Sequence, residues 1–491
     1  MSSKKQAVKD ILKMVLSNVL SLACGILMGF FIPKIMGYTD YGYYKTFALY
    51  AGYTGLLHFG ISDGIYFYFS GQKLQEINKE KLHSAIVFVF ILEALISAVG
   101  IGIAAIFIGK TCFGLIFVFV FLYNFFSHVQ NVLSLVCQAT KQFSFPSLAN
   151  SLKSLFDGCC VIVLYLLYKN REAFEVNFSI YCLVIVLSMA IEAVFFVVKL
   201  WKIIFSKGED SKLLKEDLFV YFKLGFPLMI ANLTSSLIVD VDRQFVSIFY
   251  PVDLSNTFSI FSFAYSVLSL VTAVTSAIST VLFPYMKGKD NNSLIDLYPK
   301  LDSFLLVFVS GSCASFFIVE WAVEKFISKY SDSMLYIRIL IPGLIISSSI
   351  TVLMHNYYKF LNKERIYFWQ NVVVLLLAIV TDFIAYYCII LPFDSSNPVW
   401  LTVASDFTMI IWYLISEWYL VKLFHIRHIK NDCYLFASCL SFFVIAFFFH
   451  EWIGLIIFSG AFIVLTICFF YKEIRGFFGL LRKKSKSNPT T

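Results

Sequence analysis

Apolar residues fall into long runs of about 20 or more, and short polar segments separate these runs. A helix of roughly 20 apolar residues is long enough to cross the hydrocarbon core of a bilayer. The pattern predicts an all-α, polytopic membrane protein with about fourteen transmembrane helices. The predicted spans, numbered in chain order, are 11–32, 43–69, 82–108, 113–138, 146–168, 178–204, 218–249, 256–286, 301–324, 336–359, 367–391, 398–421, 433–450 and 452–471.

Lysine and arginine residues concentrate in alternate loops. With the N-terminus in the cytoplasm, 28 of the 39 basic residues lie on the cytoplasmic side, 8 lie outside and 3 lie within spans. Cytoplasmic loops of membrane proteins carry an excess of basic residues. The distribution predicts an even number of spans with the N- and C-termini both in the cytoplasm.

The longest polar loop, at about 205–217, divides the chain near its middle. We expect a six-helix N-terminal lobe at 1–206 and a second six-helix lobe at 207–425. Residues 426–491 would form a helix pair and a basic cytoplasmic tail. Weak sequence similarities after spans 1 and 7, and after spans 4 and 10, are consistent with the six-plus-six repeats of many transporters.

Composition agrees with this picture and excludes several classes of function. The 491 residues are 59% hydrophobic and 14% charged, whereas soluble domains are about 25% charged. No loop is large enough for a catalytic domain, and motifs for phosphate binding or zinc proteolysis are missing. We therefore expect neither an enzyme nor a metal site. The net charge of +8 sits in short loops, where it sets topology, so no nucleic-acid partner is expected.

Span 7 carries the most informative charges, Asp240, Asp242 and Arg243. Charges at membrane depth are unfavourable, by about 2.5–3.5 kcal/mol each on insertion scales, and normally face a partner or a wet cavity. Asp240 and Arg243 are spaced i,i+3 and can pair, whereas Asp242 points elsewhere and needs another partner. A salt bridge between helices and a charged cavity lining are both compatible with this pattern.

Other charged residues lie inside or at the ends of spans. Lys45 and Asp63 share one face of span 2, and the i,i+4 spacing of Lys153 and Asp157 in span 5 allows them to pair. The candidates for a cationic, substrate-binding cavity are Lys45, Lys153, Lys223, Arg243 and Arg338. The candidates for ion coupling or charge pairing are Asp63, Asp157, Asp240, Asp242 and Asp382.

Several segments resemble the bacterial polysaccharide-biosynthesis flippases of the multidrug/oligosaccharidyl-lipid/polysaccharide superfamily. The similarity is most specific in residues 17–69, which include the turn GYTDYGYY at 37–44 and the run FGISDG at 59–64. Asp242-Arg243 in span 7, Phe283-Pro284, and KFLNKER at 359–365 also look like this family. One departure is YPVDLSN at 250–256, where the family usually has a Gly-Tyr turn.

The resemblance implies two six-helix lobes around a central cavity, with two additional C-terminal helices. It implies a flippase in the bacterial cytoplasmic membrane that moves undecaprenyl-diphosphate-linked oligosaccharide for capsule, exopolysaccharide or O-antigen synthesis by alternating access. The expected partners are this lipid-linked glycan, the bilayer and polysaccharide polymerase machinery, and the expected state is a monomer. No cofactor is expected, and protons and sodium ions are both candidates for coupling.

Three alternatives compete with this interpretation. A multidrug antiporter of the same superfamily would have a cavity rich in acids and aromatic residues with few cations. A flippase for the peptidoglycan precursor lipid II would do the same work on a different head group. A membrane glycosyltransferase or polymerase would need a substantial loop to hold its catalytic residues, and the sequence contains none.

Overall fold

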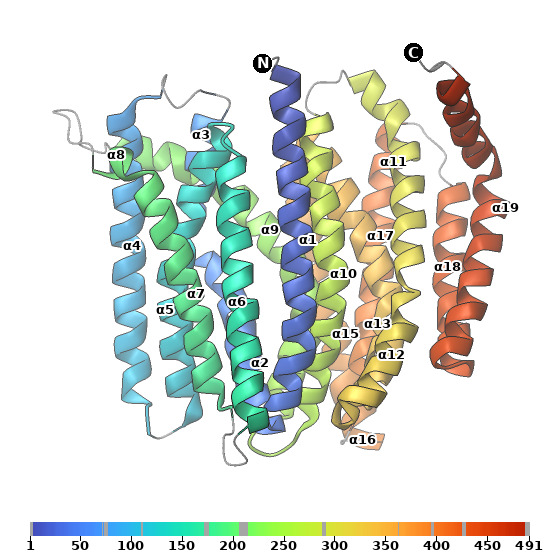
Figure 1. Cartoon of the computed structure of the whole chain (residues 1–491), viewed down its shortest axis with the longest axis horizontal. Coiled ribbons are helices and arrows are strands. Elements are labelled where there is room, and N and C mark those ends of the chain that lie inside the picture. Colours follow the sequence, from blue (N-terminus) through green and yellow to red (C-terminus); the bar gives the residue numbers. More distant parts are fainter. Residues whose placement is uncertain are drawn as a thin grey trace. The chain divides into compact units, whose positions relative to one another are not determined.

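The computed structural model describes residues 3–70, 72, 77–109, 111–170, 176–205, 215–286, 291–361, 363–393, 397–424 and 429–486, and every regular element in these ranges is a helix (Figure 1). Twelve helices of this described part are long and apolar enough to cross a membrane. The prediction of an all-α, polytopic membrane protein is therefore confirmed. The two remaining predicted spans, 43–69 and 256–286, also form helices, and the first of them is broken.

The chain forms two compact units, 1–277 with 358–401, and 278–357 with 402–491. The first unit contains α1 (Ser3–Ile35), α2 (Tyr38–Tyr53), η1 (Thr54–Leu56), α3 (Ile61–Phe69), α4 (Lys79–Ile106), α5 (Cys112–Ala139), α6 (Ser144–Asn170), α7 (Phe178–Lys199), α8 (Trp201–Ile204), α9 (Lys215–Phe249), most of α10 (Thr257–Met286), α15 (Glu364–Ile384), η4 (Ala385–Ile390) and α16 (Leu391–Phe393). The lobe boundaries at 206 and 425 stay a prediction.

The second unit is built around one deeply buried helix. It contains α11 (Asn291–Ser312), α12 (Ser315–Phe326), η2 (Ser328–Tyr330), α13 (Ser333–Ser348), η3 (Ser349–Met354), the start of α14 (His355–Phe360), most of α17 (Val399–Phe424), α18 (Ile429–Phe448) and α19 (Glu451–Lys486). Side chains of α13 are buried on all of its faces, which fits its apolar sequence. Helices α18 and α19 form an antiparallel pair.

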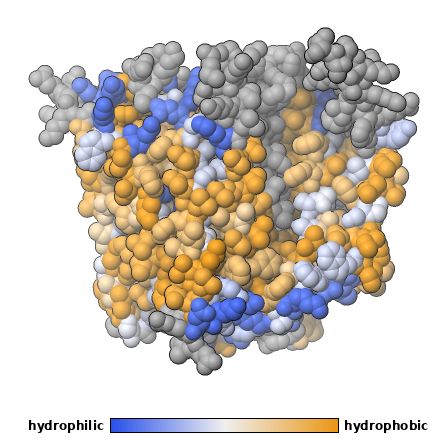
Figure 2. Space-filling model, in the orientation of Figure 1, coloured by the Kyte–Doolittle hydropathy of each residue, from blue (hydrophilic) through white to orange (hydrophobic). Residues whose placement is uncertain are grey.

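Local sequence signals explain where individual helices begin. Asn78 caps α4, because its side-chain oxygen accepts hydrogen bonds from the backbone N–H groups of Glu80 and Lys81, both at 3.1 Å. Asn177 caps α7 in the same way through the N–H of Ser179 at 2.9 Å. On the face shown in Figure 2, apolar residues cover the middle of the helices and hydrophilic residues gather near helix ends. This distribution suits a bilayer.

The broken span comprises α2, η1 and α3, and its break lies at Phe59 and Gly60, which have φ values of 49° and 73°. Gly60, which precedes α3, and Gly64 within α3 pack directly against the backbone of α9 near Tyr221 and Gly225. A side-chain atom added at any of these three glycines would overlap the backbone of the facing helix. The glycines therefore permit a very close contact between α3 and α9 in the first unit.

Candidate functional site

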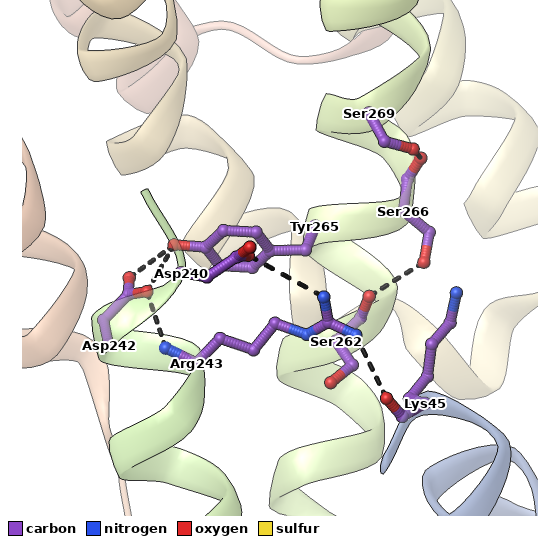
Figure 3. Close-up of polar contacts among 8 residues, drawn as sticks. All are labelled: Lys45, Asp240, Asp242, Arg243, Ser262, Tyr265, Ser266 and Ser269. Atoms are coloured by element: carbon purple, nitrogen blue, oxygen red, sulfur yellow. Dashed lines mark hydrogen bonds and ion pairs between the residues drawn. The ribbon is translucent and has the colours of Figure 1, made fainter. Parts of the chain in front are cut away.

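The charged residues of span 7 lie on α9, next to a tyrosine from α10 (Figure 3). The carboxylate of Asp242 is almost completely buried, and the hydroxyl of Tyr265 lies 2.6 and 2.5 Å from its two oxygens. The backbone N–H of Arg243 donates to the same carboxylate at 2.6 Å. Tyr265 is thus the additional partner that the orientation of Asp242 required.

Arg243 connects α9 to α2. One terminal nitrogen, Nη1, lies 3.8 Å from Oδ1 of Asp240, and the other, Nη2, donates to the backbone carbonyl of Lys45 at 3.2 Å. The guanidinium also lies over the ring of Tyr265, 5.9 Å from its centre. Its buried Nε has no acceptor among the described residues, so Arg243 retains one donor for another group.

Lys45 places a second cation beside Arg243. The side chain is 91% buried, and its ammonium lies 4.6 Å from the ring centre of Tyr44 and 5.1 Å from that of Tyr41. In the part of the chain that the structure describes, Lys45 has no carboxylate partner within ion-pair distance. Aromatic faces stabilise a cation only partly, so this ammonium remains available to an anion.

A third carboxylate reaches the same cluster from another helix. Asp382 lies on α15, which packs against α9, and it is 2% exposed. It is in electrostatic range of Asp242 on the neighbouring helix. The cluster thus combines three acids with two cations, and we define it as the α9 cluster, formed by Lys45, Asp240, Asp242, Arg243, Tyr265 and Asp382.

Serines of α10 extend the polar surface next to the α9 cluster (Figure 3). Ser259 donates to the backbone carbonyl of Tyr38 at 2.6 Å, and the hydroxyls of Ser266 and Tyr41 are 3.1 Å apart. Between them, the buried hydroxyl of Ser262 has no partner among the described residues. This row was missed from the sequence, although the recurrence of serine every three or four residues is a visible signal.

The other predicted residues of the first unit lie apart from these contacts. Lys153 and Asp157 form an ion pair with each other at 2.8 Å on α6, as their spacing allowed. Lys223 is exposed on α9. Asp63, at the start of α3, lies 3.9 Å from the ring of His58.

Arg338 belongs to the second unit and is paired there. Its Nη2 contacts the carboxylate of Glu320, which is fully buried, and lies 2.9 Å from Nδ1 of His450. Glu320 also accepts the backbone N–H of Glu451 at 2.9 Å. Arg338 therefore joins α12, α13 and the start of α19 within that unit. Whether any of the predicted residues binds substrate stays a prediction.

Comparison with known proteins identifies the class of fold. No family model matches the chain, and no curated protein matches it. A solved structure described as lipid II flippase MurJ in an inward closed conformation matches with a TM-score of 0.67 and 15% identity, covering 95% of this chain and 100% of that one. An inward-facing multidrug resistance MATE family transporter of the MOP superfamily matches with a TM-score of 0.58 and 13% identity, over 84% and 98%.

A further match is the MATE transporter ClbM in complex with Rb⁺, with a TM-score of 0.52 and 12% identity, over 85% of this chain and 96% of that one. At these identities the similarity establishes the fold and nothing finer. The chain therefore has the helical membrane fold shared by MurJ and the MATE transporters.

Proposed function

We propose that this protein is a flippase for undecaprenyl-diphosphate-linked oligosaccharide, acting in the bacterial cytoplasmic membrane with both termini in the cytoplasm. The observation that carries the proposal is the pair of neighbouring cations, buried Lys45 and partly buried Arg243, in a membrane-spanning unit. A glycan-diphosphate head cannot cross about 30 Å of hydrocarbon unaided. Cations placed within the membrane can hold the diphosphate while the polyprenyl chain stays in lipid.

The contacts of the two cations support an anionic ligand. Among the described residues, Lys45 contacts the rings of Tyr41 and Tyr44 and no carboxylate, and Nε of Arg243 has no acceptor, so both have capacity left for phosphate oxygens. The hydroxyl of Ser262 would add a donor or acceptor for a sugar. A solved structure of the same fold is described as a lipid II flippase, which is why lipid II is the alternative head group.

The acids of the α9 cluster support the proposal that an ion is coupled to transport. Asp242 and Asp382 are both buried and repel each other, which favours binding of a proton or a sodium ion when Arg243 is engaged elsewhere. We propose that such an ion drives alternating access. The same excess of acid over base favours a second candidate, a multidrug antiporter for cationic compounds.

The protein would supply capsule, exopolysaccharide or O-antigen synthesis, act as a monomer and deliver its substrate to polymerase machinery. The test is reconstitution into proteoliposomes with an undecaprenyl-diphosphate-linked oligosaccharide, followed by exposure to an external glycosidase. We expect wild-type protein to move the glycan between leaflets and Arg243→Ala to lose this activity while remaining folded. The control is Lys169→Ala, an exposed cation in the last turn of α6.

Two outcomes would contradict the proposal. One is full glycan movement by a stable Arg243→Ala protein, which would remove Arg243 from the site. The other is absence of glycan movement by wild-type protein that instead exports a cationic dye, which would favour the multidrug antiporter.

A further inference from the structure

A second buried polar group of the first unit lies on α4 and α5 and includes no residue of the α9 cluster. Glu93, near the middle of α4, is completely buried, and its Oε1 lies 2.7 Å from Nδ1 of His128 on α5. Asn124 donates from its Nδ2 to Oε2 of Glu93 and to the hydroxyl of Ser97, both at 3.0 Å. All four side chains are more than nine-tenths buried.

The short distance between Glu93 and His128 favours a shared proton. The two atoms lie 2.7 Å apart without the alignment of a hydrogen bond, and an unprotonated imidazole would leave the buried carboxylate without a compensating charge. With one proton the pair is neutral overall, as carboxylate and imidazolium or as acid and imidazole. Asn124 suits both forms, because its amide donates to a carboxylate and, after a flip, its buried and unpartnered Oδ1 would accept from a protonated Glu93.

His58 connects this pair to the break in span 2. Its ring lies 5.1 Å from the ring of His128, and its Nδ1 accepts the backbone N–H of Gly60 at 3.0 Å. His58 must therefore be unprotonated at Nδ1 while this bond exists. Since Phe59 and Gly60 have positive φ values, the bond stabilises the left-handed turn that places Gly60 against α9.

We propose that Glu93 and His128 form a proton-binding site, and that His58 links its occupancy to the turn at Phe59 and Gly60. When the shared proton makes His128 positive, repulsion between the two imidazoles keeps His58 neutral and the turn hydrogen-bonded. A proton taken up at Nδ1 of His58 would place two N–H groups against each other and release Gly60. Asp63, 3.9 Å from Nε2 of His58, favours this uptake.

Other titratable groups on the packed elements have partners or lie farther along their helices. Glu192 on α7 accepts from Gln130 at 3.0 Å, Lys81 on α4 pairs with Asp217 on α9 at 3.2 Å, and the charge of Lys359 reaches Asp63. The others include Lys45 on α2, Lys79, Glu80 and His83 on α4, Lys153 and Asp157 on α6, and Tyr221, Lys223, Asp240, Asp242 and Arg243 on α9. The proposal concerns the proton alone and holds for any substrate.

The test follows the turn itself, in full-length protein in lipid nanodiscs without substrate. Amide hydrogen exchange of residues 55–65 is measured across pH and divided by the intrinsic exchange rate at each pH. As the pH is lowered, these residues of the wild-type protein should lose protection, with a midpoint below neutral pH. Glu93→Gln and His128→Gln remove the positive neighbour of His58, so each should move the midpoint upward by about one pH unit or more.

Three further variants make the result decisive. His58→Gln keeps an acceptor but does not titrate, so protection should become independent of pH. Asp63→Asn removes the carboxylate that favours proton uptake by His58, so it should lower the midpoint. Glu192→Gln changes a buried acid that is not one of Glu93, His128 and His58, so it should leave the wild-type midpoint unchanged. An unchanged midpoint in both Glu93→Gln and His128→Gln, or a persistent pH dependence in His58→Gln, would overturn the proposal. If the buried variants do not fold, an unchanged midpoint in the better exposed Asp63→Asn would overturn the role of His58, on which the proposal depends.

Discussion

Two lysines of the first unit differ in whether an acidic side chain neutralises them. Lys45 lies on tyrosine rings, and in the described part of the chain it has no acid partner, whereas Lys153 has Asp157 at 2.8 Å. Both were equal candidates in the sequence. Burial without a carboxylate partner now separates them, because a cation that is already neutralised gains little from a diphosphate.

Replacement of Lys45 should therefore weaken binding of an anionic lipid. Lys45→Gln removes one charge-assisted hydrogen bond of about 1.5–3 kcal/mol, which corresponds to a roughly 10- to 150-fold loss of affinity. The measurement is the dissociation constant for undecaprenyl diphosphate in nanodiscs. Lys153→Gln is the matched control and should change the affinity little. Equal losses for the two variants would refute this ranking.

Tyr265 should be a stabilising partner of Asp242. Tyr265→Phe removes the hydroxyl next to a buried carboxylate and should destabilise the protein by about 1–3 kcal/mol, seen as a lower Tm. The double variant with Asp242→Asn should recover part of this loss, since a neutral amide needs the hydroxyl less. Tyr168→Phe, at an exposed position on α6, should leave Tm unchanged. A Tyr265→Phe protein with the wild-type Tm would contradict the assignment.

At the scale of elements, the sequence predicts most helices but not how they break or pair. Hydropathy places the spans because a bilayer demands continuous apolar helices. The i,i+3 spacing predicts the contact of Asp240 with Arg243. It does not predict that Tyr265 meets Asp242, since that contact depends on how α10 packs on α9. The sequence does not predict the break at Gly60, because hydropathy does not report a local change of φ.

The contact between α3 and α9 should depend on the glycines that form it. Gly225→Ala would push a methyl group into the backbone of Gly60 and Gly64, and overpacking of this kind is unfavourable by about 1–3 kcal/mol. We expect a lower Tm and faster hydrogen exchange in α3. Gly102→Ala is the control, since its added methyl group would meet open space on α4. Equal Tm values and equal exchange rates in the two variants would show that the helices can move apart at little cost.

At the scale of the whole molecule, the five predicted cations are divided between the two units. Lys45 and Arg243 share one cluster of the first unit, whereas Arg338 contacts Glu320 and His450 in the second. Contacts within each unit account for the four that are wholly or partly buried, and Lys223 is exposed. Arg338 has a structural explanation of its own, because a buried carboxylate requires a partner.

A double-mutant cycle decides between the two roles of Arg338. Arg338→Met leaves the fully buried Glu320 without its cation and should destabilise the protein by about 3–5 kcal/mol. Glu320→Gln in the same chain removes the stranded charge, while its amide oxygen can still accept the N–H of Glu451. The double variant should therefore regain much of the lost Tm. If Arg338 only joins the helices, glycan movement in proteoliposomes returns together with stability. If it also holds the diphosphate, stability returns without movement, because no neutral side chain replaces that charge.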